Sequence, residues 1–175
     1  YRAGASAAGP VAPVGFTLAE GGTTLLVADQ AQPRWVEHRP VGALAITVRP
    51  GADGADVRSV DGLAGTGDTV FVLDRASAGR HVARRDGQLS GRLGDGELKQ
   101  PVAIAADRFG RVFVVDAHDR AVKVLSLGRP AQVFDTTRLR VQAIAAIAVD
   151  ERLLAVADGV AGQVLIHTVR DMERP

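Results

Sequence analysis

The sequence predicts an all-β fold made of about four repeated units, and three observations support this prediction. A short apolar run that ends in aspartate occurs four times in the 175 residues, closing at Asp29, Asp74, Asp116 and Asp158. Successive aspartates lie 45, 42 and 42 residues apart. The 20 glycines and 8 prolines recur at short intervals, as turns require, and no segment sustains the spacing of an amphipathic helix. A fixed period in the low forties is the length of one β-propeller blade, so we expect about four blades of four antiparallel strands.

The strands of each unit can be assigned in order. The first strand precedes the repeated apolar run across a tight turn, and its clearest cases are residues 60–64, 101–107 and 143–150. In the second unit we expect this turn at residues 65–68. The apolar run itself is the second strand, and a third strand follows each aspartate at residues 34–38, 81–84, 122–125 and 164–168. A weaker fourth strand is expected at residues 43–48, 88–93 and 131–134. Two β-rich runs joined by a turn that contains Gly or Asp are typical of a hairpin.

The third unit contains the most specific motif. Residues 96–116 read GELKQPVAIAADRFGRVFVVD, with Pro101 at the start of the first strand and Gly110 in the turn. This stretch, within residues 96–125, closely resembles an NHL repeat, a kind of β-propeller blade. Ala103 stands where the family usually has Gly, and Asp119 stands where it usually has a loop Asn. The other three units lack the proline and share mainly the period and the aspartate.

The repeated aspartates have two interpretations. They would be functional if they formed a ring of carboxylates around a central channel. They would be structural if each accepted hydrogen bonds from backbone N–H groups of the loop that follows the second strand. We favour the structural interpretation, because a residue kept in every blade usually serves the architecture, whereas function depends on what differs between blades.

The histidines bear on whether the chain is an enzymatic propeller rather than a binding module. Enzymatic propellers that resemble this fold, such as lactonases and amidating lyases, hold a metal with acidic or His side chains that face the channel. The histidines here are His38, His81, His118 and His167, and no two of them have the close spacing of a metal site. His38 and His167 fall on or beyond third strands, away from the first strands that line a channel. We therefore predict no catalytic residue, no metal site and no cofactor.

Arginine clusters offer a candidate surface for a partner. Arg84 with Arg85 and Arg138 with Arg140 form two small clusters, and guanidinium groups bind carboxylates and phosphates. The alternative is a solvated surface of mixed charge, because acidic residues lie nearby in the sequence. Trp35, the single tryptophan, is expected to pack between blades.

The composition excludes several classes of function. The chain has no cysteine, so disulfides, thiolate metal sites and cysteine nucleophiles are absent. A formal net charge of +1 gives no field that would attract nucleic acid. No apolar run approaches the roughly 20 residues of a transmembrane helix. The abundance of arginine and the absence of asparagine are typical of a GC-rich bacterial genome.

The ends of the chain suggest its context. The chain begins with Tyr1 rather than Met, so we expect that a signal peptide, a lipid-anchor segment or more of the protein precedes it. A periplasmic or envelope location fits the lack of cysteine, and a cytoplasmic location fits it equally well. Residues 1–13 are expected to be a linker or extended arm, residues 14–169 to carry the blades, and residues 170–175 to be a polar tail.

The number of blades is the most informative feature for function. NHL-type propellers typically close with more than four blades, so the chain is part of a larger propeller, or joins a second copy, or closes alone. An open ring exposes the apolar face of its terminal blade and requires a partner. We therefore expect a non-catalytic protein-interaction or scaffolding module, a subunit of a larger bacterial envelope assembly, whose partners are other protein subunits or a second copy. The alternative is a metal-dependent lactonase or lyase that acts in the central channel.

Overall fold

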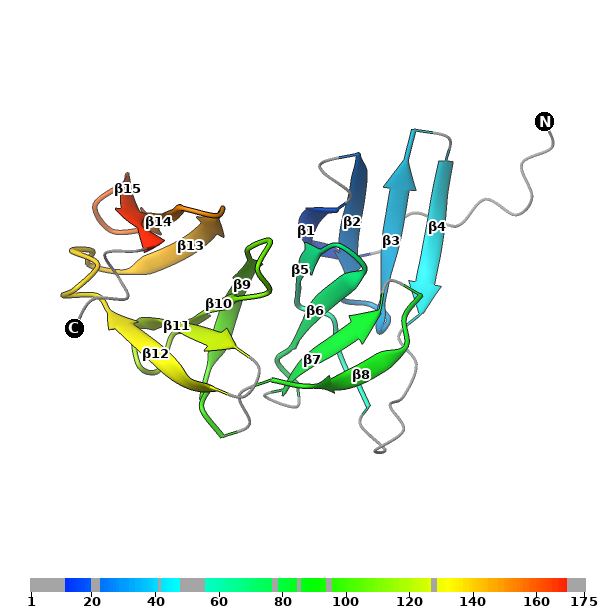
Figure 1. Ribbon diagram of the computed structural model, residues 1–175, viewed down its shortest axis with the longest axis horizontal. Helices are drawn as coiled ribbons and strands as arrows, with labels where there is room; N and C mark the ends of the chain where they lie inside the picture. The colour runs from blue at the N-terminus through cyan, green and yellow to red at the C-terminus, as the bar shows by residue number, and fades with distance from the viewer. Residues whose placement is uncertain are drawn as a thin grey trace. The chain divides into compact units, whose positions relative to one another are not determined.

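The structure is a computed structural model that describes residues 12–19, 23–40, 42–47, 56–76, 79–84, 86–93, 96–126 and 129–169. It divides into two compact units, residues 1–92 and residues 93–175, and each unit contains two antiparallel sheets (Figure 1). The predicted tail at residues 170–175 and nearly all of the predicted linker lie outside the described residues. Strand β1 begins at Pro13, the last residue assigned to that linker.

The first unit contains two four-stranded sheets in which the strands follow one another in sequence order. The first sheet consists of β1 (Pro13–Ala19), β2 (Thr24–Asp29), β3 (Arg34–Arg39) and β4 (Gly42–Thr47). The second sheet consists of β5 (Gly62–Thr66), β6 (Thr69–Asp74), β7 (Gly79–Arg84) and β8 (Leu89–Arg92). This succession of antiparallel neighbours is the topology of a propeller blade.

The second unit repeats the pattern. Its first sheet consists of β9 (Pro101–Ala106), β10 (Val112–Asp116), β11 (Ala121–Ser126) and β12 (Arg129–Asp135). Its second sheet consists of β13 (Ile144–Val149), β14 (Leu153–Asp158) and β15 (Gln163–Thr168), so three strands of this blade lie within the described residues. The predicted all-β propeller fold is confirmed, with four blade-like sheets.

One predicted boundary is wrong. The first strand of the second unit was expected at residues 60–64 with a turn at residues 65–68, but β5 runs from Gly62 to Thr66. Thr66 pairs with Thr69, which leaves Gly67 and Asp68 as a two-residue hairpin turn. Gly67 has a φ of 55°, a conformation that glycine adopts without strain. Gly65 lies in the strand rather than in the turn, because it pairs with Val70 on β6.

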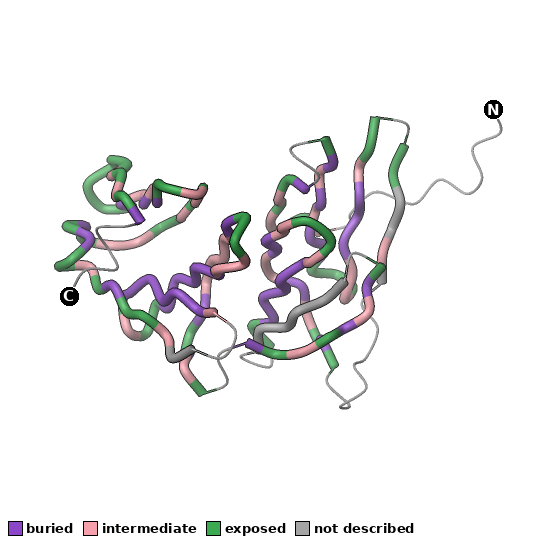
Figure 2. The backbone as a smooth tube through the Cα atoms, in the orientation of Figure 1, coloured by how far each residue is buried: buried purple, intermediate pink, exposed green. Residues whose placement is uncertain are grey.

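Each unit has an apolar core between its two sheets. In the first unit, Leu26 and Trp35 of the first sheet are buried with Leu63 and Val70 of the second, as expected for a tryptophan packed between blades. A corresponding core joins the two sheets of the second unit, with Phe113, Val122, Phe134, Leu154 and Val156 among its buried members. Strands β6 and β10 are buried along nearly their whole length (Figure 2), which explains their uninterrupted apolar sequence.

Among the described residues, no helix is long and apolar enough to cross a membrane.

Candidate functional site

The four repeated aspartates end the second strand of each sheet, and all four are buried. Each carboxylate accepts a hydrogen bond from a backbone N–H that precedes the first strand of its own sheet. The donors lie 16 or 17 residues upstream: Ala12 for Asp29 (3.1 Å), Arg58 for Asp74 (2.8 Å), Lys99 for Asp116 (2.8 Å) and Gln142 for Asp158 (2.7 Å). The repeated contact joins the entry of every sheet to the end of its second strand.

Asp29, Asp116 and Asp158 also bind the turns that follow them. Asp29 accepts from Ala31 N at 3.2 Å, Asp116 from His118 N at 3.1 Å, and Asp158 from Val160 N at 3.0 Å. The sequence predicted contacts to this following turn, whereas the upstream contact was not foreseen. Each such carboxylate therefore fixes two loops at one end of its sheet.

The hydrogen bonds favour the ionised form of these acids. The Gln142 N–H, with those of Ala161, Val160 and Ala143, lowers the pKa of Asp158 from 3.8 to about 2. Burial acts to raise the pKa of Asp116, but donors from Lys99, Lys123 and Gln100 outweigh it and lower the pKa.

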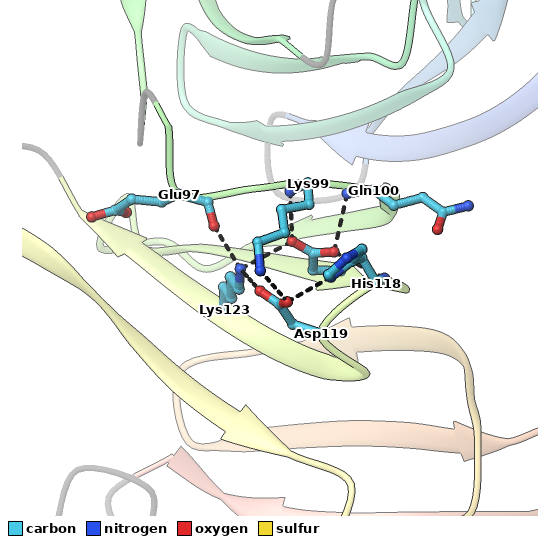
Figure 3. A network of polar contacts seen from close by, with 7 residues as sticks. Glu97, Lys99, Gln100, His118, Asp119 and Lys123 are labelled. Atoms are coloured by element: carbon cyan, nitrogen blue, oxygen red, sulfur yellow. Dashed lines mark hydrogen bonds and ion pairs between the residues drawn. The ribbon is translucent and has the colours of Figure 1, made fainter.

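The third blade adds a polar network around Lys123 on β11 (Figure 3). The Lys123 side chain is only 6% exposed, and its Nζ donates to Asp116 Oδ2 at 3.0 Å and Asp119 Oδ2 at 2.5 Å. It also donates to the backbone carbonyl of Glu97 at 2.5 Å. Burial acts to lower the pKa of Lys123, but its bonds to the two carboxylates outweigh that effect and raise the pKa.

Asp119 completes the network from the loop between β10 and β11. Its Oδ1 accepts from Lys99 Nζ at 2.9 Å and lies 2.8 Å from Nδ1 of His118. Hydrogen bonds from Lys123, Lys99 and His118 hold the pKa of Asp119 well below its usual range. Because these carboxylates and cations pair with one another, the network suits a structural clamp better than a proton-transfer site.

Sequence reasoning missed this network, although a signal was present. Lys99 and Lys123 are the only lysines in the chain, and both bind Asp119. Asp119 was noted only as the replacement for a loop asparagine. Both lysines lie in the repeat that most resembles the family, and Lys123 follows Asp119 by four residues. This pattern indicated a site that the other blades lack.

The predicted arginine surface divides between the two units. Arg84 lies on β7, its side chain is outside the described part, and Arg85 is outside it altogether. Arg138 and Arg140 lie in the turn between β12 and β13, and both are exposed. These two arginines line a pocket of about 490 Å³, whose other walls are Leu139, Leu165, Ile166, His167 and Thr168. The structure therefore brings one of the two predicted clusters to a concave surface.

The histidines come from different elements of the fold. His38 lies on β3 and His167 on β15, both third strands as predicted, and His118 lies in the β10–β11 loop. His81 lies on β7, with its side chain outside the described part. Within the described residues, no group of three or more His, Cys, Asp or Glu side chains is placed to hold a metal ion.

The last sheet has one packed face and one exposed apolar face. Ile147, Val156 and Leu165 are cross-strand neighbours on the face that joins the core. The opposite face, here called the β13–β15 face, consists of Ala146, Ala148, Leu153, Ala155, Ala157, Val164, Ile166 and Thr168. Val164 is 63% exposed and Ile166 58% exposed, so large apolar side chains lie open on it.

The first sheet carries a comparable surface. Phe16 is 72% exposed and Leu18 56% exposed, and they alternate along β1 on the side away from the core. Their cross-strand partners Val27 and Leu25 on β2 are only half-buried. These four residues form what is called here the β1–β2 face.

The fold belongs to the β-propeller class, and comparisons with known proteins agree with this. No protein-family model matches the chain, and no curated protein matches it. Among solved structures, the chain is similar to virginiamycin B lyase from Staphylococcus aureus, with a TM-score of 0.61 and 12% identity over 89% of the chain. It is also similar to the WD40 repeats of RRP9, with a TM-score of 0.66 and 17% identity over 93% of the chain.

A chain of a nidogen–laminin complex is similar as well, with a TM-score of 0.55 and 16% identity over 92% of this chain and 77% of that one. The chain spans about half the length of the other two structures, 54% of the lyase and 49% of the RRP9 repeats. At these identities the similarity establishes the propeller fold alone, and the matched proteins include both an enzyme and repeat domains.

Proposed function

We propose that the chain is a non-catalytic protein-interaction module that associates with a second copy of itself through its terminal sheets. The observation that supports this most directly is the exposed β13–β15 face, where Leu153, Val164 and Ile166 carry no charge and lie open to solvent. Fully burying a side chain of this kind contributes about 1.5–3 kcal/mol, so such a face favours association.

The two exposed faces differ in side-chain size, which favours a head-to-tail contact. The β1–β2 face presents large residues, Phe16 and Leu18, on its first strand. The β13–β15 face presents Ala146 and Ala148 on its first strand and Ala155 and Ala157 on the next. Packed sheets lie about 10 Å apart with interdigitating side chains, so large residues pack best against small ones. Each face therefore complements the other better than itself, which defines a heterologous interface.

The test is the mass of the protein in solution over a wide concentration range. We expect the native chain to associate, and Phe16→Lys or Val164→Lys to shift it towards monomer. Val160→Lys is the matched control, because Val160 is 67% exposed in the turn after β14 and lies outside the face. A chain that stays monomeric at every concentration would contradict the proposal.

A mixing experiment tests the head-to-tail arrangement. Phe16→Lys retains an intact β13–β15 face, and Val164→Lys retains an intact β1–β2 face. Mixing the two variants restores one intact interface, so we expect a mixed dimer where each variant alone is monomeric. Face-to-face pairing of identical surfaces would instead give an associated species from one variant alone.

The enzymatic alternative from the sequence has its own test. A metal-dependent lactonase or lyase requires a bound ion, and stoichiometric Ca²⁺ or Zn²⁺ in the purified protein would favour it over an interaction module. A subunit role in a bacterial envelope assembly remains a proposal that rests on the sequence alone, and cell fractionation of the source organism tests its location.

A further inference from the structure

We propose that the pocket between Arg138, Arg140 and strand β15 binds a small amphipathic acid, a molecule in which a carboxylate or phosphate group is attached to an apolar body. The pocket lies where the β12–β13 turn meets β15 in the second unit. Its volume of about 490 Å³ falls within the usual range of small-molecule sites. This proposal does not rest on the proposed self-association, and either proposal can fail without the other.

The turn contributes two arginines to the lining of the pocket. Arg138 and Arg140 flank Leu139, whose side chain is only 1% exposed and belongs to the core of the unit. The buried leucine anchors the turn, while both arginines remain exposed beside it. The Arg138 guanidinium lies 4.8 Å from the centre of the Phe134 ring, which limits its freedom. The Arg140 side chain forms no ion pair with the described residues, so its charge is available to an oxyanion.

Backbone hydrogen bonds hold this turn in one conformation. Leu139 N donates to Asp135 O at 3.0 Å, and Val141 N donates to Thr136 O at 3.0 Å. Arg140 has a φ of 54°, in the left-handed region that a residue with a side chain rarely adopts. Asp135 is the acid on this turn, and its Oδ1 accepts from Arg138 N at 2.8 Å. Arg140 therefore carries a charge that no described acid pairs with, and the backbone hydrogen bonds position its turn before a ligand arrives.

Strand β15 supplies the apolar wall and a polar group without a partner. Leu165 and Ile166 line the pocket together with Thr168. His167 also lines it, and its Nε2 is buried with no hydrogen-bond partner within the described part of the chain. A buried polar atom without a partner is costly, so a ligand group that reaches this nitrogen gains a hydrogen bond at little cost in desolvation.

The shape of the site favours a small molecule over an acidic protein. An acidic protein segment needs an extended basic surface, whereas here the two arginines stand at one concave site with aliphatic residues beside them. The pairing of a cationic end with an apolar wall matches a ligand that is charged at one end and apolar at the other.

The experiment is an NMR titration with octanoate, octyl phosphate, inorganic phosphate and octanol, following the amide and arginine Nε–H signals. We expect saturable shifts at Arg140, His167 and Thr168 with octanoate or octyl phosphate. Octanol lacks the anionic group and inorganic phosphate lacks the apolar chain, so each should bind at least about tenfold more weakly. The tighter of the two octyl acids identifies the preferred headgroup.

Matched substitutions separate the pocket from general charge effects. Arg140→Gln should weaken octanoate binding about tenfold or more, because it removes one charged hydrogen-bond donor. Arg152→Gln removes the same charge from an exposed turn outside the pocket and should leave the affinity within about twofold. The His167 ring signals should shift on octanoate binding, while those of His118 should not.

Three results would overturn the proposal: no saturable shift with either octyl acid, equal losses in the two arginine variants, or octanol binding as tightly as octanoate. If an oligoglutamate peptide shifts the pocket signals and the octyl acids do not, the site binds an acidic protein segment instead. Arg140 and Arg152 are both exposed, so neither substitution should prevent folding, and the amide spectrum of each variant verifies this.

Discussion

Asp116→Ala tests the role of the repeated aspartates most directly. The Asp116 carboxylate is fully buried and accepts from the N–H groups of Lys99, Gln100 and His118 at 2.8 to 3.1 Å, as well as from Lys123 Nζ. Removing one partner of a buried ion pair costs about 3–5 kcal/mol. The substitution also leaves three backbone donors without their acceptor, although water can reach some of them. We therefore expect a loss of about 4 kcal/mol in the free energy of unfolding of the second unit.

The measurement must report the second unit, because Trp35, the only tryptophan, lies in the first. Amide hydrogen exchange meets this need, since it resolves single residues. In Asp116→Ala, the amides of Lys99, Gln100 and His118 should lose protection, while that of Val72 on β6 should keep it. Urea unfolding followed by circular dichroism should show an earlier transition for the second unit.

Asp68→Ala is the matched control. Asp68 is an exposed aspartate in the β5–β6 turn and makes no hydrogen bond or ion pair with the described residues. Its substitution should change the stability by no more than about 0.5 kcal/mol. If Asp116→Ala costs less than about 1 kcal/mol and the three amides stay protected, the architectural explanation is wrong. The repeated pattern of carboxylates would then need a functional reason.

Three further predictions concern the second unit and the acid range. Lys123→Met should cost about 3 kcal/mol by urea unfolding, less than Asp116→Ala, because Asp116 keeps its three backbone donors. The lowered pKa of Asp158 contributes stability that is present above its usual pKa of 3.8 and is lost as the pH falls through about 2. The lowered pKa of Asp116 adds a contribution that is also lost as the pH falls, and Asp158→Asn should flatten the Asp158 part of the pH–stability curve. Gly110→Ala should cost about 1 kcal/mol in thermal unfolding, because Gly110 has a φ of 78° while no atom lies near the added Cβ.

Most of the fold was predictable from the sequence because each blade repeats two local features that have a direct physical cause. A second strand buried on both faces needs an uninterrupted apolar run, and the aspartate that follows it satisfies backbone donors. Both features repeat every 42 to 45 residues. The positions of Asp74 and Asp158 are therefore enough to predict where the second strands of their blades end. The failure at β5 has the opposite cause. Gly65 resembles a turn residue in the sequence, and only its pairing with Val70 shows that it belongs to a strand.

The candidate sites were less predictable because they depend on residues far apart in the chain. Arg138 and Arg140 stood out as a cluster, but their pocket requires His167 on a strand almost 30 residues later. Lys99 and Lys123 likewise meet at Asp119 only because β9 to β11 form one sheet. The exposed β13–β15 face could be anticipated only as a consequence of an open ring. Which side of that sheet is packed follows from the register, which a single sequence does not specify.

The pocket and the β13–β15 face share two residues, Ile166 and Thr168, and this links the two proposals. Ile166 lines the pocket and is also exposed on the face. A bound octyl chain that covers Ile166 removes part of the apolar surface that association would bury, so octanoate should weaken self-association. Thermodynamic linkage then requires association to weaken octanoate binding by the same factor. Val164→Lys lies on the face but outside the pocket, so it should abolish association while leaving the octanoate affinity of the monomer intact. Measuring the mass with and without octanoate tests the link, and an unchanged association constant at saturating octanoate would show that the two sites are independent.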